Sequence, residues 1–369
     1  FLHPHPATPD PVVTGVQTCA LPIFLYGSIK TCLLKGEEHF MKKAISLFLT
    51  AVLLLCSFSF LMPAYATNLA QAQLDLSQYT MDDLMNMSAE EYRALLREFE
   101  RVYDPFDTYD TNPIMEEEET PPRIAPRWAS GNIENGEYVE QGSHEYITAK
   151  ACDILTKDKG FFSMNESANV FIVLAISIAS LTPDKDENKN IFEGHFYHAI
   201  DGDSWTGSKT NTALVNCRNH FDSAVHAAKV GDIDVMYSEL GRALHYIQDA
   251  GEPHHAANIV NIPLIKTAHG DFETFVDNDI DSYVKLISSV NGYRFSSFSN
   301  PTYASAASHS VDFLVQQTAS IAYTFRSQVS NTLNRTYWDY VASETVPNAV
   351  GFSALLLYKF AYASGMALY

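Results

Sequence analysis

One stretch constrains this chain more than any other, because it repeats imidazole and carboxylate side chains at helical spacing. His245 and Asp249 lie four residues apart, and His269 and Glu273 repeat that spacing. Residues four apart lie on one face of an α-helix, so each pair can direct two side chains to one point. A Gly and a Pro between the pairs predict a turn, and His255 adds a further imidazole. The stretch therefore predicts two helices that carry metal ligands.

Imidazole nitrogen and carboxylate oxygen are ligands that zinc takes in proteins, and a catalytic zinc keeps one position open for water. Clustered zinc ions that share a bridging carboxylate suit phosphoryl oxygens, which makes phosphoester hydrolysis the first chemistry to consider. One His–Asp pair at helical spacing is common on helix surfaces and would not by itself predict a site. Five such residues within 29 positions are poorly explained by chance.

The N-terminal part of the chain contains targeting and processing segments. Residues 1–40 begin with Phe and include VVTGVQTCALPI, which resembles the translation of a sequencing-adapter fragment, so we predict a non-native extension; a disordered tail is the alternative. Residues 41–66 have the lysines, apolar stretch and small-residue cleavage site of a secretory signal peptide. We therefore predict that the protein is secreted and extracellular. A retained N-terminal membrane anchor is the alternative.

Residues 67–127 differ in composition from the C-terminal two thirds of the chain. The segment SAEEYRALLREFERVYD predicts a charged amphipathic helix, and an acidic run at 116–119 and the proline-rich TPPRIAPR come after it. The prolines predict an extended segment that proteases can reach. We interpret residues 67–127 as a propeptide with a cleavable linker. A solvated acidic linker without function is the alternative.

The remainder reads as a folded domain. With 369 residues, 46% of them hydrophobic, the chain can bury a sizeable core. Apolar residues at helical spacing predict helices around 211–229, 303–330 and 345–366. The apolar run at 170–180 is short for a bilayer and predicts a buried helix, so no transmembrane segment is expected in the mature chain. The net charge of -20 argues against nucleic-acid binding through a basic surface.

Further candidate ligands precede the His245 to Glu273 stretch. A loop leads from Trp128 to His144, which opens a predicted amphipathic helix. Asp184 lies in a predicted loop broken by Pro183, eleven residues before His195. The two cysteines of this region, Cys152 and Cys217, are too few for a disulfide framework, and whether they pair stays open.

The motifs around these residues resemble the bacterial zinc-dependent phospholipase C family, which includes phosphatidylcholine-hydrolysing enzymes and the catalytic domains of related haemolytic toxins. HYIQDAGEPHHAAN resembles the family's H-x3-D-x5-H segment, and the gaps to His269 and Glu273 follow its pattern. EGHFYH resembles its HF(Y/W) motif, and PDKDEN the acidic loop before it. The resemblance covers residues 128–369. It implies an all-α, multi-helix single catalytic domain, of the type shared with zinc-dependent single-strand nucleases.

The resemblance also implies three zinc ions. The first would be held by Asp184, His195, His245 and Asp249. The second would be held by His144, by Asp249 as a bridge, and by the free amine and carbonyl of Trp128. The third would be held by His255, His269 and Glu273. His255, rather than the neighbouring His254, keeps the family spacing from Asp249.

The implied reaction converts phospholipids of a membrane surface to diacylglycerol and a phosphorylated head group. Clustered cations neutralise a phosphodiester and lower the pKa of a water, and the resemblance makes Asp184 the general base. An amide nitrogen is a poor zinc ligand, whereas an α-amine with a pKa of about 8 can be deprotonated by the metal. We therefore expect an inactive precursor, which a maturation protease activates by cutting before Trp128.

The head-group pocket departs from the family. Choline-preferring members have an aromatic residue after the acidic-loop aspartate, whereas this chain has Lys185. Phe192 directly precedes the EGHFYH motif and His198 is its last residue, and both are candidates for lining the pocket. A zwitterionic or an anionic head group would therefore suit this chain.

Two other functions stay open. Single-strand nucleases of this fold place the last histidine farther along and follow it with Asp, so the fourteen-residue gap and Glu273 favour the phospholipase. The acidic charge also disfavours a nucleic-acid partner. A secreted binding protein that retained the zinc site without activity is the third interpretation.

Overall fold

The computed structural model describes residues 74–103, 132–134, 137–139, 142–160, 162, 165–187, 192–260, 267–295, 300–330 and 335–368. All of these belong to one compact unit, Met62–Tyr369. The predicted extension, the signal peptide, the proline-rich linker and Trp128 lie outside the described residues.

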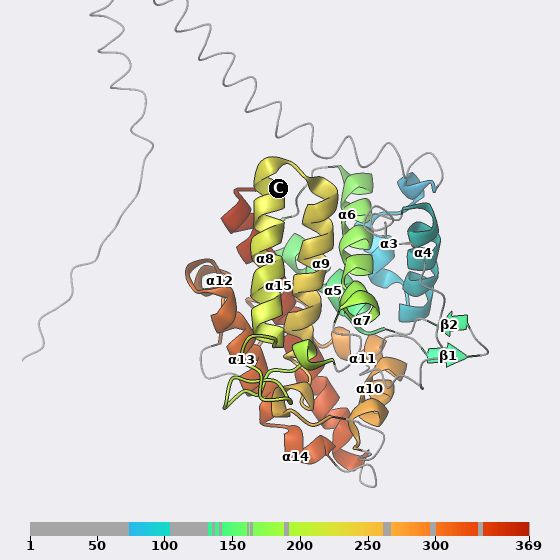
Figure 1. Ribbon diagram of the computed structural model, residues 1–369. Coiled ribbons are helices and arrows are strands. Elements are labelled where there is room, and N and C mark those ends of the chain that lie inside the picture. The colour runs from blue at the N-terminus through green and yellow to red at the C-terminus, as the bar shows by residue number, and fades with distance from the viewer. Residues whose placement is uncertain are drawn as a thin grey trace, which may run out of the picture. The chain divides into compact units, whose positions relative to one another are not determined.

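The described part of the chain is helical, in agreement with the all-α fold that the motifs implied (Figure 1). The exception is a small antiparallel sheet of β1 (Asn132–Glu134) and β2 (Glu137–Val139), in a stretch that the sequence predicted as a loop. The other elements are, in chain order, η1 (Leu76–Gln78), α3 (Met81–Asn86), α4 (Ala89–Val102), α5 (His144–Lys159), α6 (Glu166–Ala179), α7 (Thr182–Asp186), η2 (Glu193–His195), α8 (Ala213–Val230), α9 (Ile233–Asp249), η3 (His255–Ala257), α10 (His269–Asn278), α11 (Ile280–Val284), α12 (Tyr303–Ser308), α13 (Val311–Tyr323), α14 (Arg326–Val329), η4 (Arg335–Tyr337) and α15 (Trp338–Ser364).

Two helices form the scaffold for the ligands of the His245 stretch. α8 ends at Gly231, which adopts the left-handed conformation that glycine tolerates, and Asp232 caps α9 by accepting a hydrogen bond from the Val235 amide. The two helices then run side by side (Figure 1). A Cβ on Gly241 of α9 would lie 2.3 Å from the Cβ of Ala179. Glycine at this position therefore lets α6 approach α9 closely, and α6 leads directly into α7.

The core lies between α15 and the helices α5, α8, α9 and α13. α15 is 27 residues long and contains Pro347, yet most of its length is buried. The stretch Glu166–Asp186 is apolar and long enough to cross a membrane, but 89% of its most apolar window is buried inside the protein. The prediction of a buried helix at 170–180 is thus confirmed by α6.

The segment before residue 104 packs against this core. The amphipathic helix that the sequence predicted is α4, which begins with a capping box between Ser88 and Glu91. Its apolar face buries Tyr92, Leu95 and Phe99. Packed structure therefore begins well before residue 128 in this chain.

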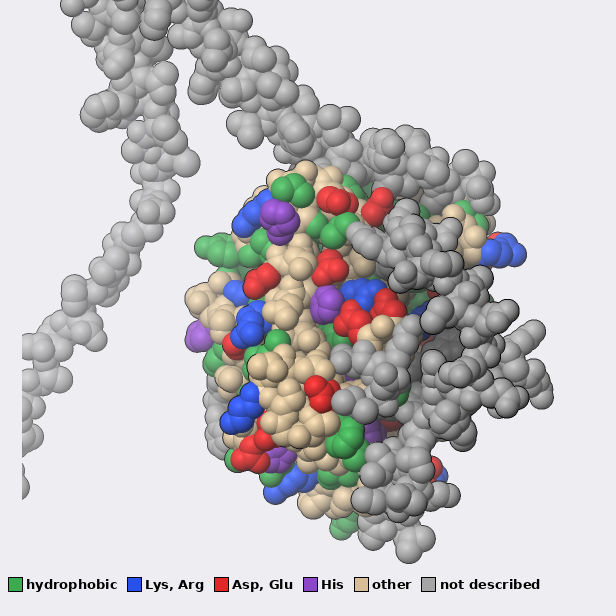
Figure 2. Space-filling model, in the orientation of Figure 1, with side chains coloured by type: hydrophobic (Ala, Val, Ile, Leu, Met, Phe, Trp, Pro, Cys, Tyr) green, Lys and Arg blue, Asp and Glu red, His purple; other side chains and the backbone are tan. Residues whose placement is uncertain are grey.

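The surface carries mixed charge. On the face shown in Figure 2, the acidic and basic side chains of the described residues are interspersed, and no continuous basic area covers that face. Cys152 of α5 and Cys217 of α8 are free, buried thiols, and burial raises the pKa of both. This arrangement answers the pairing question that the sequence left open.

Candidate metal centre

The predicted ligands that lie within the described residues come from six helical elements, and their side chains meet in the interior. α9 supplies His245 and Asp249 from its last turn, and α5, η3 and α10 each begin with a ligand. Of the remaining three ligands, His195 ends η2, Asp184 lies in α7, and Glu273 lies in α10. The structure brings together eight of the nine predicted ligands: His144, Asp184, His195, His245, Asp249, His255, His269 and Glu273.

Asp184 lies in a helical turn, not in the loop that Pro183 suggested. Pro183 occupies the first turn of α7, where its missing N–H and fixed φ do not disturb a helix. The turn presents the Asp184 carboxylate to α9. The sequence-based prediction of a broken loop is therefore wrong at this position.

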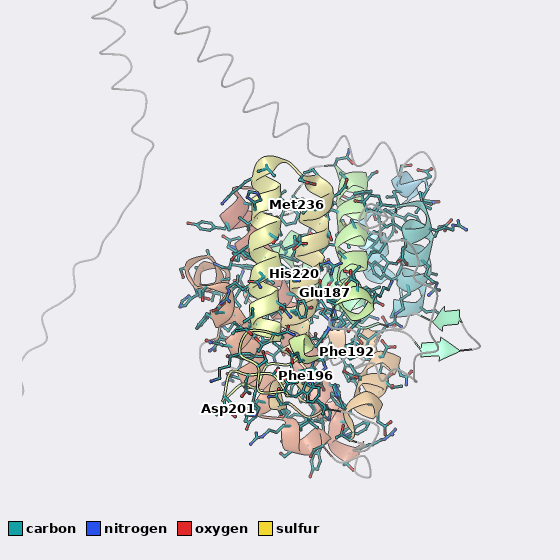
Figure 3. All side chains as sticks on the ribbon, in the orientation of Figure 1. Glu187, Phe192, Phe196, Asp201, His220 and Met236 are labelled. Atoms are coloured by element: carbon teal, nitrogen blue, oxygen red, sulfur yellow. The ribbon has the colours of Figure 1, made fainter. Side chains whose placement is uncertain are left out.

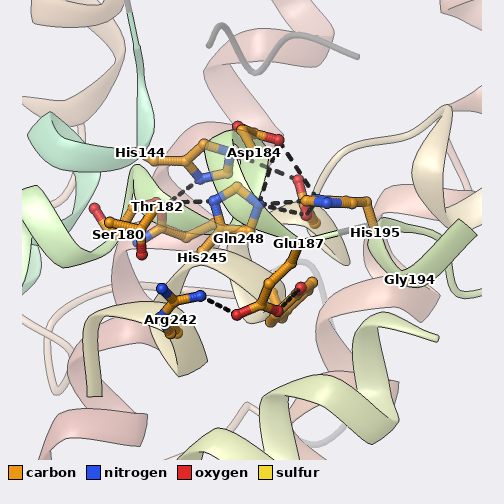
Figure 4. Close-up of polar contacts among 12 residues, drawn as sticks. His144, Ser180, Thr182, Asp184, Glu187, Gly194, His195, Arg242, His245 and Gln248 are labelled. Carbon is orange, nitrogen blue, oxygen red and sulfur yellow. Dashed lines mark hydrogen bonds and ion pairs between the residues drawn. The ribbon is translucent and has the colours of Figure 1, made fainter. Parts of the chain in front are cut away.

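Asp249 lies between His144, His195 and His245, three rings that converge in Figure 4. Its Oδ2 lies 2.8 Å from His195 Nδ1 and 3.0 Å from His245 Nε2. Its Oδ1 lies 3.6 Å from His144 Nε2. Asp184 Oδ1 approaches His195 Nδ1 at 3.6 Å and His245 Nε2 at 3.7 Å. One carboxylate therefore faces two groups of nitrogen ligands with its two oxygens, which is the geometry of a bridging ligand.

Outer hydrogen bonds orient the imidazoles. His245 Nδ1 donates to the Ser180 carbonyl at 2.8 Å, and His144 Nδ1 donates to Gln248 Oε1 at 2.8 Å. Gln248 Nε2 in turn donates to Thr148 Oγ1 at 2.9 Å. These contacts leave the Nε2 atoms of both rings as acceptors that point toward Asp249.

The donor set suits a cation. His245 Nε2 and His195 Nδ1 lie only 2.9 Å apart, and two nitrogen lone pairs are stable at that separation only if they share a proton or a cation. Burial lowers the pKa of His245, but Asp249 and Asp184 together raise it to about 9. Burial also acts against the charged form of Asp249, yet His245 and His255 hold its pKa well below the ordinary value. The cluster therefore attracts positive charge strongly.

A second group of ligands lies beside the first. His269 Nε2 is 2.9 Å from Glu273 Oε1, and His255 Nε2 is 3.5 Å from the same oxygen. His255 Nδ1 donates to the His195 carbonyl at 2.9 Å, whereas its buried Nε2 makes no hydrogen bond to another described residue. Burial raises the pKa of Glu273 to about 8, against the effect of His255. A buried imidazole nitrogen that accepts no hydrogen bond can be satisfied by coordination to a metal ion.

Glu252 belongs to this second group, although sequence reasoning missed it. Its carboxylate is fully buried, accepts from the His255 amide at 2.7 Å and lies 3.9 Å from His269 Nε2. Burial opposes ionisation, but His254 and His269 lower the pKa of Glu252 to about 2. His254 binds Glu252 Oε1 through Nδ1 at 2.7 Å and stacks on His269. The position of Glu252, three residues after Asp249, was the available sequence signal.

A polar network outside the cluster holds α7 in place, and two of its members, Glu187 and His220, are labelled next to each other in Figure 3. Glu187 follows α7 and accepts hydrogen bonds from Tyr246 and Arg242 of α9, while His220 Nε2 of α8 lies 3.2 Å from it. Arg242 also binds both carboxylate oxygens of Asp186. Burial opposes the charge on Glu187, but His220 and Arg242 lower its pKa. The residue after the Asp184 turn is therefore anchored to two long helices.

The three predicted pocket residues lie in different surroundings. Lys185 Nζ pairs with Glu100 of α4 at 3.2 Å. His198 Nδ1 pairs with Asp201 at 2.8 Å. Phe192 is buried, and its ring centroid lies 5.8 Å from that of His195. Of the three side chains, Phe192 thus has the contact with a ligand ring.

Known proteins resemble part of the chain. No family model matches the sequence. The chain is 25% identical to a phospholipase C of Paraclostridium bifermentans over 240 residues, which cover 59% of this chain and 58% of that protein. It is 26% identical to a phospholipase C of Bacillus cereus over 175 residues, which cover 46% of this chain and 59% of that protein. The chain thus spans less than two thirds of either relative.

A solved structure supports the fold. The alpha toxin from Clostridium absonum superposes with a TM-score of 0.50 at 22% identity, covering 59% of this chain and 62% of the toxin chain. At this identity the similarity concerns the fold alone. Together the relatives and the fold support the bacterial phospholipase C family that the motifs indicated.

Proposed function

We propose that this relative of the bacterial phospholipases C is a secreted, zinc-dependent hydrolase of the glycerol-side phosphodiester bond of phospholipids. The products are diacylglycerol and a phosphorylated head group. The observation that carries the proposal is that the buried Asp249 carboxylate lies close to His195, His245 and His144. The second group of ligands, around Glu273, lies next to it. Such a density of imidazole nitrogen and carboxylate oxygen ligands suits clustered divalent cations.

We assign the residues to three ions as the motif resemblance implies. Zinc held at these positions would supply positive charge for the phosphoryl oxygens and would lower the pKa of a water molecule. Trp128 is assigned to the second ion through its α-amine and carbonyl and lies outside the described residues. The assigned ligands are Asp184, His195, His245 and Asp249 for the first ion, His144, Asp249 and Trp128 for the second, and His255, His269 and Glu273 for the third.

The protein side chains have separate tasks in this proposal. Asp184 turns Oδ1 toward His195 and His245, so its second carboxylate oxygen is available to accept a proton from the attacking water. The hydrogen bonds from His245 to Ser180 and from His144 to Gln248 prevent the rings from turning away from the centre. Because the rings are already fixed, the site does not need to reorganise when charge develops on the phosphate.

The proposal includes activation by cleavage. Only a free α-amine at Trp128 can serve as a nitrogen ligand, so the uncut chain lacks one donor of the second ion. A signal peptide at 41–66 and a cleavable linker before Trp128 agree with secretion as a precursor.

The test uses residues 67–369 with Ala125→Glu and Pro126→Gly, which convert residues 124–127 to the factor Xa sequence Ile-Glu-Gly-Arg and place the cut directly before Trp128. Cut and uncut protein are incubated with mixed phospholipid vesicles and, in parallel, with single-stranded DNA. Diacylglycerol is measured with and without a zinc chelator, and bound metal is counted by mass spectrometry. An Asp184→Asn variant of the cut protein is the matched control.

We expect diacylglycerol from the cut protein only, its loss with the chelator, and intact DNA. Cleavage of DNA with intact lipid would instead assign the chain to the nucleases. Bound zinc without hydrolysis of either substrate would support the binding-protein interpretation. Equal activity of the uncut protein would overturn activation by cleavage alone.

A further inference from the structure

The segment 74–103 is built into the folded domain through an apolar face. Tyr92 and Phe99 of α4 are fully buried. Phe99 packs on Phe171 of α6 with ring centroids 5.3 Å apart, and Tyr92 packs on Tyr146 of α5 at 5.8 Å. The Tyr92 hydroxyl donates to Ser177 Oγ at 2.8 Å inside the core. Removal of α4 would therefore expose aromatic surface and a polar group that is now buried.

An ion-pair pocket of the domain receives a side chain of this segment. Arg93 Nε binds Glu145 Oε1 at 2.9 Å, and its Nη2 binds Asp277 Oδ1 and the Gly142 carbonyl, each at 2.6 Å. Both acids are buried. Two buried carboxylates without Arg93 would be strongly unfavourable, so the pocket is complete only with the segment in place.

The domain also supplies hydrogen-bond partners to the backbone of the segment. Glu166 accepts from the amide of Met81, the first residue of α3, at 2.6 Å. Asp281 accepts from the amide of Ala89, the first residue of α4, at 3.0 and 3.1 Å. Acidic side chains at helix N-termini satisfy amides that have no partner within the helix. Side chains from distant parts of the chain thus cap both helices.

These contacts reach the elements that carry the metal ligands. Glu145 directly follows His144 in α5, and Asp277 lies one turn after Glu273 in α10. Lys185, the neighbour of Asp184 in α7, pairs with Glu100 of α4 at 3.2 Å. The segment is therefore tied to the neighbours of ligands that we assign to each of the three ions.

We propose that residues 74–103 stay bound after cleavage before Trp128, as a non-covalent second chain of the mature enzyme that positions the ligand-bearing ends of α5, α7 and α10. The inference rests on the cleavage in the proposed function. Cleavage then frees the Trp128 amine without removal of the segment, since residues 74–103 bind directly to α5, α6 and α10.

The experiment uses the same factor Xa variant of residues 67–369. After cleavage, size-exclusion chromatography at physiological salt and native mass spectrometry measure whether the N-terminal fragment travels with residues 128–369. Arg93→Met is compared with Arg101→Ala, a change of an α4 arginine whose side chain is 76% exposed. Zinc retention is measured in parallel by competition with a chelator of known affinity.

We expect a one-to-one complex in the cut protein and in Arg101→Ala. Arg93→Met is expected to weaken retention of the fragment at least tenfold and to lose zinc at a lower chelator concentration. Separation of the fragment from the cut protein, while residues 128–369 keep their metal and melting temperature, would overturn the inference. Should Arg93→Met fail to fold, the unmodified pair still decides retention. The experiment measures the mass of the complex and its bound zinc, and neither depends on catalysis. Absence of lipid hydrolysis would therefore count against the proposed function, while retention of the fragment could still be decided.

Discussion

Arg242 is the side chain whose replacement most directly tests how Asp184 is held. Its guanidinium binds both oxygens of Asp186, the last residue of α7, and one oxygen of Glu187, which follows it. The Arg242 side chain is only 11% exposed, whereas that of Asp186 is 45% exposed. Arg242→Met keeps an unbranched apolar stem in this position and removes the charged donors.

The contacts set the size of the effect. A hydrogen bond to a charged group contributes about 1.5 to 3 kcal/mol when it is buried, and an exposed ion pair contributes about 1 kcal/mol at most. Asp186 is half-exposed, so its pair falls in the lower class, and Glu187 retains Tyr246 and His220 as partners. We therefore expect Arg242→Met to lower the free energy of unfolding by about 2 to 3 kcal/mol. If half of this free energy serves to position Asp184 for the reaction, its loss lowers kcat/KM about tenfold.

The assay is a double-mutant cycle on the cut protein. Arg242→Met, Glu187→Gln and the double variant are compared for urea unfolding, zinc retention and kcat/KM, with a coupling of about 1 to 2 kcal/mol expected between the two sites. Arg218→Met is the matched control. Arg218 forms an ion pair with Asp312, with an N–O distance of 2.9 Å, and this pair does not involve α7. The reasoning is refuted if Arg242→Met and Arg218→Met lower kcat/KM equally, or if the two sites show no coupling.

Two further changes probe the centre and its support. Asp249→Asn removes the carboxylate that faces the imidazoles, so we expect at least about 100-fold weaker zinc retention, measured by metal analysis after dialysis; full zinc occupancy in the variant would contradict a bridging role. Burial lowers the pKa of His220, but Glu187 and Glu239 raise it from 6.5 to about 9. This group therefore contributes stability that is full below pH 6.5 and is lost as the pH rises through about 9, on the order of 3 kcal/mol. His220→Gln should flatten the decline of unfolding free energy between pH 7 and 9, and an unchanged decline in urea titrations would reject this account.

Helical periodicity predicted the larger elements of the fold but not their ends. The segment expected around 211–229 is α8, at Ala213–Val230. The segment expected around 303–330 is divided, because Ser310 caps a new helix there by accepting from the Phe313 amide. Pro347 would by itself predict an interruption, yet α15 continues through it, since tertiary packing on all sides outweighs the local preference. Local signals therefore give element type more reliably than boundaries.

The site shows the same division between local and tertiary information. Spacing alone paired His245 with Asp249, because both ligands lie on one helix. Asp184 was a candidate from the sequence, but only the motif resemblance assigned it to an ion, since a ligand in a short turn has no periodic partner. Glu252 and Arg242 were not assigned, because their roles depend on side chains from other elements. Their partners become identifiable only when α7, α9 and α10 are placed together.

The N-terminal segment illustrates how composition can conceal a packed element. The composition of residues 67–127 suggested a propeptide with a cleavable linker or a solvated acidic linker, while Tyr92, Leu95 and Phe99 recur at the spacing of one helix face. An isolated helix of fourteen residues is marginal in water, so such a face requires a surface to cover it. The sequence contains that requirement but does not identify the cover. The buried carboxylates that receive Arg93 do identify it, because an anionic pocket in a domain core is favourable only when its cation is present.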